Sequence, residues 1–497
     1  MSTLALGFWS FPVLLGLIFL RAPIGAAMFL VGVGGLWMVT GSPNMALNLL
    51  KAESYSTFSS YSLSIIPMFL LMGQFATLSG MSTSLFKAAE GWLGHRKGGV
   101  AMASVGACAG FGAICGSSLA TAATMSRVAL PELKRYGYSG GFSTATLAAG
   151  GTLGILIPPS VILVIYAILT EQNIASLFLV AFVPGILAAI GYMLTISIYV
   201  RLNPDSAGVK ERVPYADRFK ALAEIWPVVV VFGLVVGGIY AGWFTPTEGA
   251  AVGAAGTGLL ALVRGNMTWA LFKESIITTA VSSAMIFFIV LGAKVYNSFL
   301  ALTQMPQELS MWVVSQGFAP LTVLILILVF YLVLGCLMDS LSMILLTIPI
   351  FWPVMQLMDF GLISLIDMQA ARLAEGIASG VAMAPDLLAE AQAKLAEGIP
   401  LVRDEFRALG LRPVTEAMHA DFNQTLTAIW FGILVLIVVE VGLITPPVGM
   451  NLFIINAMDR ATPMTATYRA VMWFVASDVI RVAILVAFPA ITLFLLR

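Results

Sequence analysis

Long apolar runs separated by short polar segments extend along almost the whole chain. A helix needs roughly 20 mostly apolar residues to cross a bilayer, and most of the runs are close to that length. They lie near residues 5–20, 24–40, 62–80, 99–130, 141–170, 174–200, 224–243, 246–263, 275–296, 313–356, 422–457 and 466–494. This pattern predicts an all-α polytopic membrane protein.

Two of the runs, 99–130 and 313–356, are too long for one span and have polar, glycine-containing centres. We predict that each forms a re-entrant hairpin, which enters and leaves the membrane on the same side. Irregular backbone at that depth is tolerated where it is buried in protein or lines a cavity. The runs 141–170 and 422–457 each contain a Pro-Pro pair, and each is predicted to be a broken helix.

An internal repeat relates the two halves of the chain. The segment GTLGILIPP at 151–159 matches VEVGLITPP at 439–447, with an offset of 288 residues. Upstream of these, the segment CGSSLA matches CLMDSLS, so that Ser118 aligns with Ser340 at an offset of 222. Gly/Pro-broken segments at corresponding positions of two halves are typical of secondary transporters built from inverted repeats.

The two offsets differ by 66 residues, which is close to the length of the polar segment 357–421. We interpret this segment as an insertion in a second repeat at 222–497, which follows a first repeat at 1–200 and a basic loop at 201–221. Cytoplasmic loops are rich in Lys and Arg, so the basic loop is predicted to be cytoplasmic. The acidic insertion is predicted to be periplasmic, and the repeats to be inverted.

The insertion is rich in Ala, Leu, Glu and Arg, and it has ten acidic and five basic residues. These residue types favour helix. We therefore expect surface helices that break near Pro385, Pro400 and Pro413.

Composition narrows the possible functions. Hydrophobic residues make up 60% of the chain and charged residues 10%, with a mean hydropathy of +0.98, which excludes a soluble enzyme, a disordered chain and a nucleic-acid binder. His95 and His419 lie in polar stretches, so a haem, a catalytic zinc or a membrane-embedded Ser-His pair is not expected. Cys108, Cys115 and Cys336 lie in apolar runs and are expected to be buried and free.

The centre of the first hairpin offers oxygen ligands for a small cation. Gly116 permits a tight tip, and Ser117, Ser118, Thr121 and Thr124 place hydroxyl groups near the middle of the membrane. Hydroxyls and freed backbone carbonyls are the ligands that coordinate Na⁺ where transporter helices unwind. The alternative is that these small polar residues only let helices pack closely.

The Pro-Pro pairs provide a second set of candidate ligands. Because proline has no N–H, Pro158-Pro159 and Pro446-Pro447 are expected to release the carbonyl groups of Gly154 and Gly442. Thr445 adds a hydroxyl group at the second break. The alternative is a packing kink at each pair.

Charged residues inside apolar runs are functional candidates by default. Asp339 lies at the tip of the second hairpin beside Ser340 and Ser342, and Glu440 precedes the second break. Asp478 and Arg481 have the i,i+3 spacing of a structural ion pair. The absence of a paired-carboxylate or His relay favours Na⁺ over H⁺ as coupling ion, with no cofactor.

Five segments together resemble a known family. The large membrane subunit, or DctM-like subunit, of tripartite ATP-independent periplasmic (TRAP) transporters has similar motifs over nearly the whole chain. The segments that carry this resemblance are GAICGSSLATAATM (112–125), GGTLGILIPPSVILVIY (150–166), TPTEGAA (245–251), LGCLMDSLSMILLTIPI (334–350) and IVVEVGLITPPVGMNLF (437–453).

The resemblance implies a membrane permease subunit and no enzyme. Such a subunit imports organic acids, such as C4-dicarboxylates, sialic acid or related carboxylates, across the bacterial inner membrane with Na⁺ in an elevator mechanism. The implied partners are a periplasmic substrate-binding protein and a small four-helix, DctQ-like membrane subunit, expected here as a separate chain. The alternative function is a stand-alone secondary transporter or exchanger that needs no binding protein. The insertion is expected to contact one of these partners, and the alternative is that it is a tolerated loop.

The resemblance and the motifs together give a set of candidate site residues. Sodium is expected at the first tip and break, with Ser117, Ser118, Gly154 and Pro158, and at the second, with Gly335, Gly442, Thr445 and Gly449. The carboxylate substrate is expected between the two tips, at Ser118, Thr121, Asp339, Ser340 and Ser342.

Overall fold

The structure is a computed structural model that describes residues 2–381 and 383–496. These residues form helices and no strand, which confirms the predicted all-α class. Within them, four helices are long and apolar enough to cross a membrane alone, and up to seven spans result when bent pairs are joined. The four are α10 (Ile174–Leu202), α15 (Trp269–Thr303), α22 (Glu416–Gly442) and α24 (Met464–Ala487).

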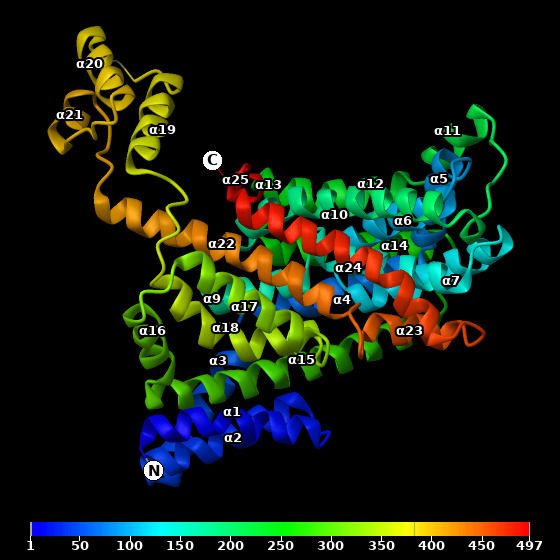
Figure 1. Ribbon diagram of the computed structural model, residues 1–497, viewed down its shortest axis with the longest axis horizontal. Helices are drawn as coiled ribbons and strands as arrows, with labels where there is room; N and C mark the ends of the chain where they lie inside the picture. The colour runs from blue at the N-terminus through cyan, green and yellow to red at the C-terminus, as the bar shows by residue number, and fades with distance from the viewer. Residues whose placement is uncertain (1, 382, 497) are drawn as a thin grey trace.

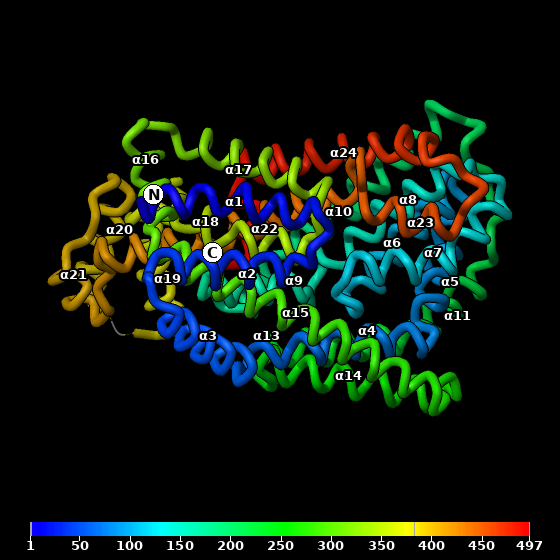
Figure 2. The backbone as a smooth tube through the Cα atoms, turned by 90° about the horizontal axis from the view of Figure 1, so that it is seen from below, coloured from blue at the N-terminus to red at the C-terminus, as the bar shows by residue number. Residues whose placement is uncertain are grey.

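An outer layer consists of helices that pair across the two halves of the chain. Helix α2 (Ile24–Thr40) packs along α15, and α14 (Pro246–Val263) packs along α4 (Ile65–Leu78). The approach of α2 to α15 is close because Gly32 meets the backbone of Tyr296, as small residues allow in membrane helices. Figures 1 and 2 show α1 (Thr3–Phe19), α2 and α15 side by side along one face.

The central layer contains the two predicted hairpins and the helices beside them. In the first half, α6 (Gly99–Cys115) and α7 (Ser118–Arg135) pack against each other and against α8 (Gly140–Leu156). In the second half, α17 (Pro320–Gly335) and α18 (Ser340–Gln356) pack in the same way against α22. Glycine, alanine, serine and threonine dominate α8, and it is buried from residue 141 to 156.

The second hairpin is shorter than the sequence predicts. Residues 313–315 belong to α16 (Met305–Ser315), a separate helix that ends before Gly317, where φ is +67°. Helix α17 then begins at Pro320, because the fixed φ of proline suits the first position of a helix. The first hairpin instead reaches Arg135, five residues beyond the predicted end near 130.

The two halves also cross over within the central layer. Helix α9 (Val161–Thr170) follows α8 after a bend of 44° and packs against α18 of the second hairpin. Helix α23 (Met450–Met458) follows α22 and packs against α7 and α8. An ion pair of 2.6 Å between Lys134 and the buried Asp459 joins the ends of α7 and α23. Each broken helix therefore ends against the hairpin of the other half.

The insertion forms three short helices that project from one end of the molecule (Figure 1): α19 (Leu365–Ala378), α20 (Pro385–Ala396) and α21 (Arg403–Ala408). As expected, Pro385 begins α20, and Pro400 and Pro413 lie in the connections. The three helices share a small core of their own, separate from the main one, made of Leu373, Ala391, Leu401, Phe406, Leu409 and Val414. Residues 416–421 belong to the first turns of α22.

The opposite end of the molecule in Figure 1 carries α5, the end of α7 and α11, where many of the basic residues lie. The remaining elements complete the connections and the surface. They are α3 (Pro43–Phe58), α5 (Met81–Leu93), α11 (Tyr215–Ala223), α12 (Trp226–Phe232), α13 (Gly238–Tyr240), α25 (Pro489–Leu493), 3₁₀ turns at Ser62–Ser64 and Pro204–Ser206, and a π-helical turn at Gly233–Gly237.

Candidate functional site

The tip of the first hairpin lies against the first Pro-Pro break. Helix α6 ends at Cys115, Gly116 has φ +63°, and Ser117 caps α7 by accepting a hydrogen bond from the Ala120 N–H. A Cβ atom at position 116 would lie 2.9 Å from the carbonyl oxygen of Pro159. Glycine is therefore required here both by its left-handed backbone and by the closeness of the break.

Gly154 forms the floor of this first tip. A Cβ atom there would lie 2.8 Å from the carbonyl oxygen of Ser117 and would overlap the hydroxyl oxygen of Thr121. Gly112 of α6 crosses Gly154 backbone to backbone. The Thr121 hydroxyl is fully buried beside the Cys115 thiol, and within residues 2–381 and 383–496 no hydrogen bond of regular geometry satisfies it. Carbonyl and hydroxyl oxygens thus converge on a small space, a donor set that fits Na⁺.

The second break has a similar crossing of glycines. Gly335, at the end of α17, meets Gly442, at the end of α22, with the two Cα atoms facing each other. Gly449 has φ +64° and lies near the Thr445 carbonyl, while the Thr445 hydroxyl donates to the Val441 carbonyl at 2.6 Å. All four predicted residues of the second sodium site therefore lie together.

One detail of this break differs from the expectation. The carbonyl group of Gly442 is not simply released, because it accepts a hydrogen bond of 3.1 Å from the Thr445 N–H. Pro446 removes the donor of the regular helix, and the chain tightens into a 3₁₀-type turn that replaces it. One lone pair of this carbonyl remains for another partner.

The tip of the second hairpin uses its acidic residue as a helix cap. Asp339 accepts hydrogen bonds from the N–H of Ser342 at 3.1 Å and from its hydroxyl at 2.5 Å. Ser117 and Asp339 are both N-caps, and they are 222 residues apart, the offset found in the sequence. Asp339 therefore has a structural task at the tip, and Ser342 is its partner.

A carboxyl group connects the two tips. Glu440 of α22 is 1% exposed, and its Oε1 accepts a hydrogen bond of 2.8 Å from the Ser340 hydroxyl of the second tip. Ser118, from the first tip, interacts with the same carboxyl group. Its other oxygen, Oε2, is buried, and it has no hydrogen-bond partner among the residues that the structure describes. Ser118 and Ser340, aligned in the sequence, thus meet around one side chain.

A buried polar network lies behind this site. Asp478 pairs with Arg481 at 2.8 Å, which confirms the predicted ion pair. The Tyr192 hydroxyl donates to Asp478 at 2.8 Å and lies 3.0 Å from the Thr152 hydroxyl. The network ties α24 to α10 and α8.

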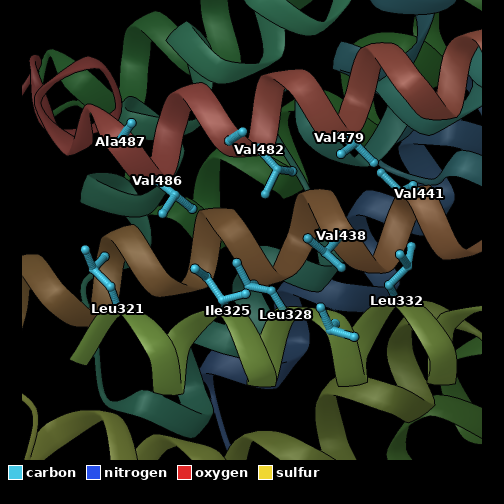
Figure 3. Close-up of a pocket in the computed structure, with 12 residues that line it drawn as sticks. Leu321, Ile325, Leu328, Leu332, Val438, Val441, Val479, Val482, Val486 and Ala487 are labelled. Carbon is cyan, nitrogen blue, oxygen red and sulfur yellow. The ribbon is translucent and has the colours of Figure 1, made fainter. Parts of the chain in front are cut away.

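The apolar groove shown in Figure 3 is not a candidate for a carboxylate site. It has a volume of about 560 Å³ and lies between α17, α22 and α24. All of its lining residues are aliphatic: Leu321, Ile325, Leu328, Val329, Leu332, Val438, Val441, Val479, Val482, Ala483, Val486 and Ala487. Neither Glu440 nor Asp478 lines it. Such walls offer no charge or hydrogen bond to a carboxylate, which is costly to bury without one.

The family model of the DctM component of the tripartite ATP-independent periplasmic transporter matches residues 11–491. The chain belongs to this family. A curated DctM relative, the C4-dicarboxylate TRAP transporter large permease protein of Pseudomonas aeruginosa, is 31% identical over 93% of this chain and 92% of its own length. The DctM family membership confirms the resemblance and identifies the chain as a subunit of a membrane transporter.

Two further relatives differ in the substrates that their names give. The sialic acid TRAP transporter large permease protein SiaM of Vibrio cholerae is 26% identical over 97% of this DctM chain and 96% of its own length. The isethionate TRAP transporter permease protein DctMQ of Oleidesulfovibrio alaskensis is 25% identical over 90% of this chain and 61% of its own. Among solved structures, the YdaH transporter of Alcanivorax borkumensis aligns with a TM-score of 0.50 and 12% identity over 88% of each chain, a likeness of fold alone.

The structure of this DctM chain places the sequence candidates in three groups. The first tip and break bring together Ser117, Thr121, Gly154 and the Pro158-Pro159 pair, and the second break brings together Gly335, Gly442, Thr445 and Gly449. Ser118 and Ser340 meet at Glu440. The sequence marks Glu440 only as a charge in an apolar run, and such an isolated charge is itself a signal of function. The three cysteines are buried and free, as predicted.

Proposed function

We propose that this chain is the permease subunit of a Na⁺-coupled, binding-protein-dependent importer of organic acids in the bacterial inner membrane. The observation that supports this most directly is the convergence of two hairpin tips and two broken helices. Interrupted helices of this kind hold coupling ions and substrate in secondary transporters.

Inverted repeats are part of this proposal. Each half has a capped hairpin tip, a Gly-Gly crossing and a Pro-Pro break, and the packing between the halves is reciprocal: α2 lies on α15 as α14 lies on α4. Likewise, α9 lies on α18 as α23 lies on α7. Reciprocal contacts of this type are what a pseudo-two-fold axis between repeats produces.

Two sodium sites follow from the oxygen groups at the breaks. The first would use Ser117, Ser118, Gly154 and Pro158, with the buried Thr121 hydroxyl as a further ligand. The second would use the carbonyl and hydroxyl groups of the residues at its own break, Gly335, Gly442, Thr445 and Gly449. The structure supports this choice by bringing each set together.

The substrate would lie between the tips, near Ser118, Thr121, Ser340 and Ser342. Both α7 and α18 begin there, and the first-turn N–H groups that the caps Ser117 and Asp339 leave free would offer hydrogen bonds to an anion. Asp339 would act as a cap that fixes the second tip. A carboxylate is the substrate class that we propose, in line with the C4-dicarboxylate and sialic acid relatives.

Orientation and partners complete the proposal. Basic residues at one end of the molecule would lie in the cytoplasm, which puts the insertion in the periplasm. There it would contact the periplasmic binding protein or the small membrane subunit, which the isethionate relative's DctMQ name suggests as a second component. The central helices would then move as a body against the outer layer of α2, α4, α14 and α15, as in an elevator.

Reconstitution into liposomes tests this function. Uptake of a labelled C4-dicarboxylate should require an inward Na⁺ gradient, the small subunit and the loaded binding protein. Uptake by the chain alone would instead support the stand-alone transporter. Deletion of 360–418 tests the insertion, which is a tolerated loop if both uptake and complex formation are unchanged.

A further inference from the structure

Glu440 occupies an unusual position in the chain. It is the one charged residue between Asp421 and Asp459, and it lies on α22, where nearly every residue from 426 to 442 is buried apolar side chain or glycine. The whole residue is only 1% exposed. A charge at such a position is costly unless something compensates it.

The charges around Glu440 do not compensate it. Asp478, which acts on the Glu440 carboxyl group, is already neutralised by Arg481 at 2.8 Å. Over residues 2–381 and 383–496, no Lys, Arg or His side chain makes an ion pair with Glu440. Its partners are the hydroxyl groups of Ser340 and Ser118, and in the described part of the chain no hydrogen bond of regular geometry reaches Oε2.

The position of Glu440 in the fold indicates where a compensating cation would bind. Glu440 lies two residues before Gly442 and five before Thr445, on the helix that leads into the second break. Its contact with Ser118 puts it next to Ser117, the cap of the first tip. One carboxylate therefore lies close to both groups of oxygen ligands, which otherwise consist of neutral hydroxyl and carbonyl groups.

We propose that the Glu440 carboxylate is the counter-charge shared by the two cation sites, and that it couples their occupancy. This inference rests on the proposed Na⁺ coupling and adds the group that makes the two sites interdependent. Binding at one site orders the tip that hydrogen-bonds to Glu440 and so fixes the charge that the other site uses. Glu440 acts as a positioning and charge-balancing residue between the tips.

The size of the effect follows from electrostatics. A unit charge about 10 Å from a bound cation, at an effective dielectric constant of about 20, changes its affinity by about tenfold. Glu440→Gln removes the charge but keeps the shape and an acceptor for the Ser340 hydroxyl. Since burying a neutral amide costs less than burying a lone carboxylate, this variant is expected to fold.

The test is the Na⁺ dependence of thermal unfolding of the full chain, purified in nanodiscs, at constant ionic strength with K⁺ as replacement. Wild type is expected to be stabilised cooperatively by Na⁺. E440Q should need about tenfold more Na⁺ and lose the cooperativity, whereas Asp421→Asn, an exposed neutralisation on the same helix, should match wild type. Glu440→Asp keeps the charge and should recover most of the Na⁺ affinity.

The outcomes distinguish the role of Glu440 from the proposed Na⁺ coupling. A wild type that responds to Na⁺ and an E440Q variant with the same Na⁺ midpoint and cooperativity would overturn the role of Glu440 and leave Na⁺ coupling intact. A wild type that does not respond to Na⁺ would overturn the proposed coupling itself. If E440Q does not fold, an E440D variant that has lost cooperativity despite its charge would overturn the inference.

Discussion

Replacing Gly154 with alanine should disrupt the first tip. The added methyl group would lie 2.8 Å from the Ser117 carbonyl oxygen and closer still to the Thr121 hydroxyl. Carbon and oxygen normally stay more than about 3 Å apart, so the tip has to move by several tenths of an ångström. The backbone of Gly112 also approaches Gly154 closely, which leaves α8 little room to shift.

Overpacking of this kind costs about 1–3 kcal/mol. The matched control is Gly34→Ala, because Gly34 is a helical glycine on α2 with no atom within 4 Å of the added Cβ. That substitution should be neutral or stabilise the helix by up to about 1 kcal/mol.

Thermal unfolding of both variants with and without Na⁺ provides the measurement. We expect G154A to unfold at lower temperature and to lose most of the stabilisation by Na⁺, while G34A keeps it. Equal stability and equal Na⁺ response of the two variants would refute the view that the first tip leaves no space for a side chain at position 154.

Three further predictions concern other parts of the molecule. Ser118→Ala and Thr445→Ala should each raise the Na⁺ concentration for half-maximal uptake, and an unaltered Na⁺ dependence in both would reject these ligand assignments. Burial would raise the pKa of Asp459, but its bonds to Lys134 hold that pKa below the usual value. The resulting stabilisation is present at neutral pH and is lost as pH falls through that lowered pKa. The unfolding temperature of wild type should therefore fall in acid, and that of Asp459→Asn should lack this fall. The buried Gln369 side chain donates to the carbonyl and accepts from the N–H of Leu401, in the connection between α20 and α21. Gln369→Leu should therefore destabilise the insertion by about 2–4 kcal/mol, measured as faster proteolysis of the insertion while the membrane helices stay intact.

Local chemistry explains why much of the site could be predicted. Glycines before Pro-Pro pairs and Ser-rich hairpin centres recur in both halves of the sequence, so spacing alone marks Gly154, Gly442 and Ser118 as site candidates. The N-caps Ser117 and Asp339 keep the 222-residue offset because a cap is encoded by residues within one turn.

Other features depended on tertiary packing. The run 313–356 is continuous in hydropathy, so the turn at Gly317 that separates α16 from α17 was not visible. The role of Glu440 depends on α22 passing both tips, which no pattern within α22 encodes. Asp339 was flagged by its charge, but only the structure reveals that its oxygens are occupied by Ser342.

The exchange of α9 and α23 between the halves has a consequence for folding. Each half completes the other, as protomers do in a domain-swapped dimer, so neither hairpin has its full set of neighbours within its own half. Fragments 1–221 and 222–497, expressed apart, should therefore each be degraded, and co-expression should rescue both.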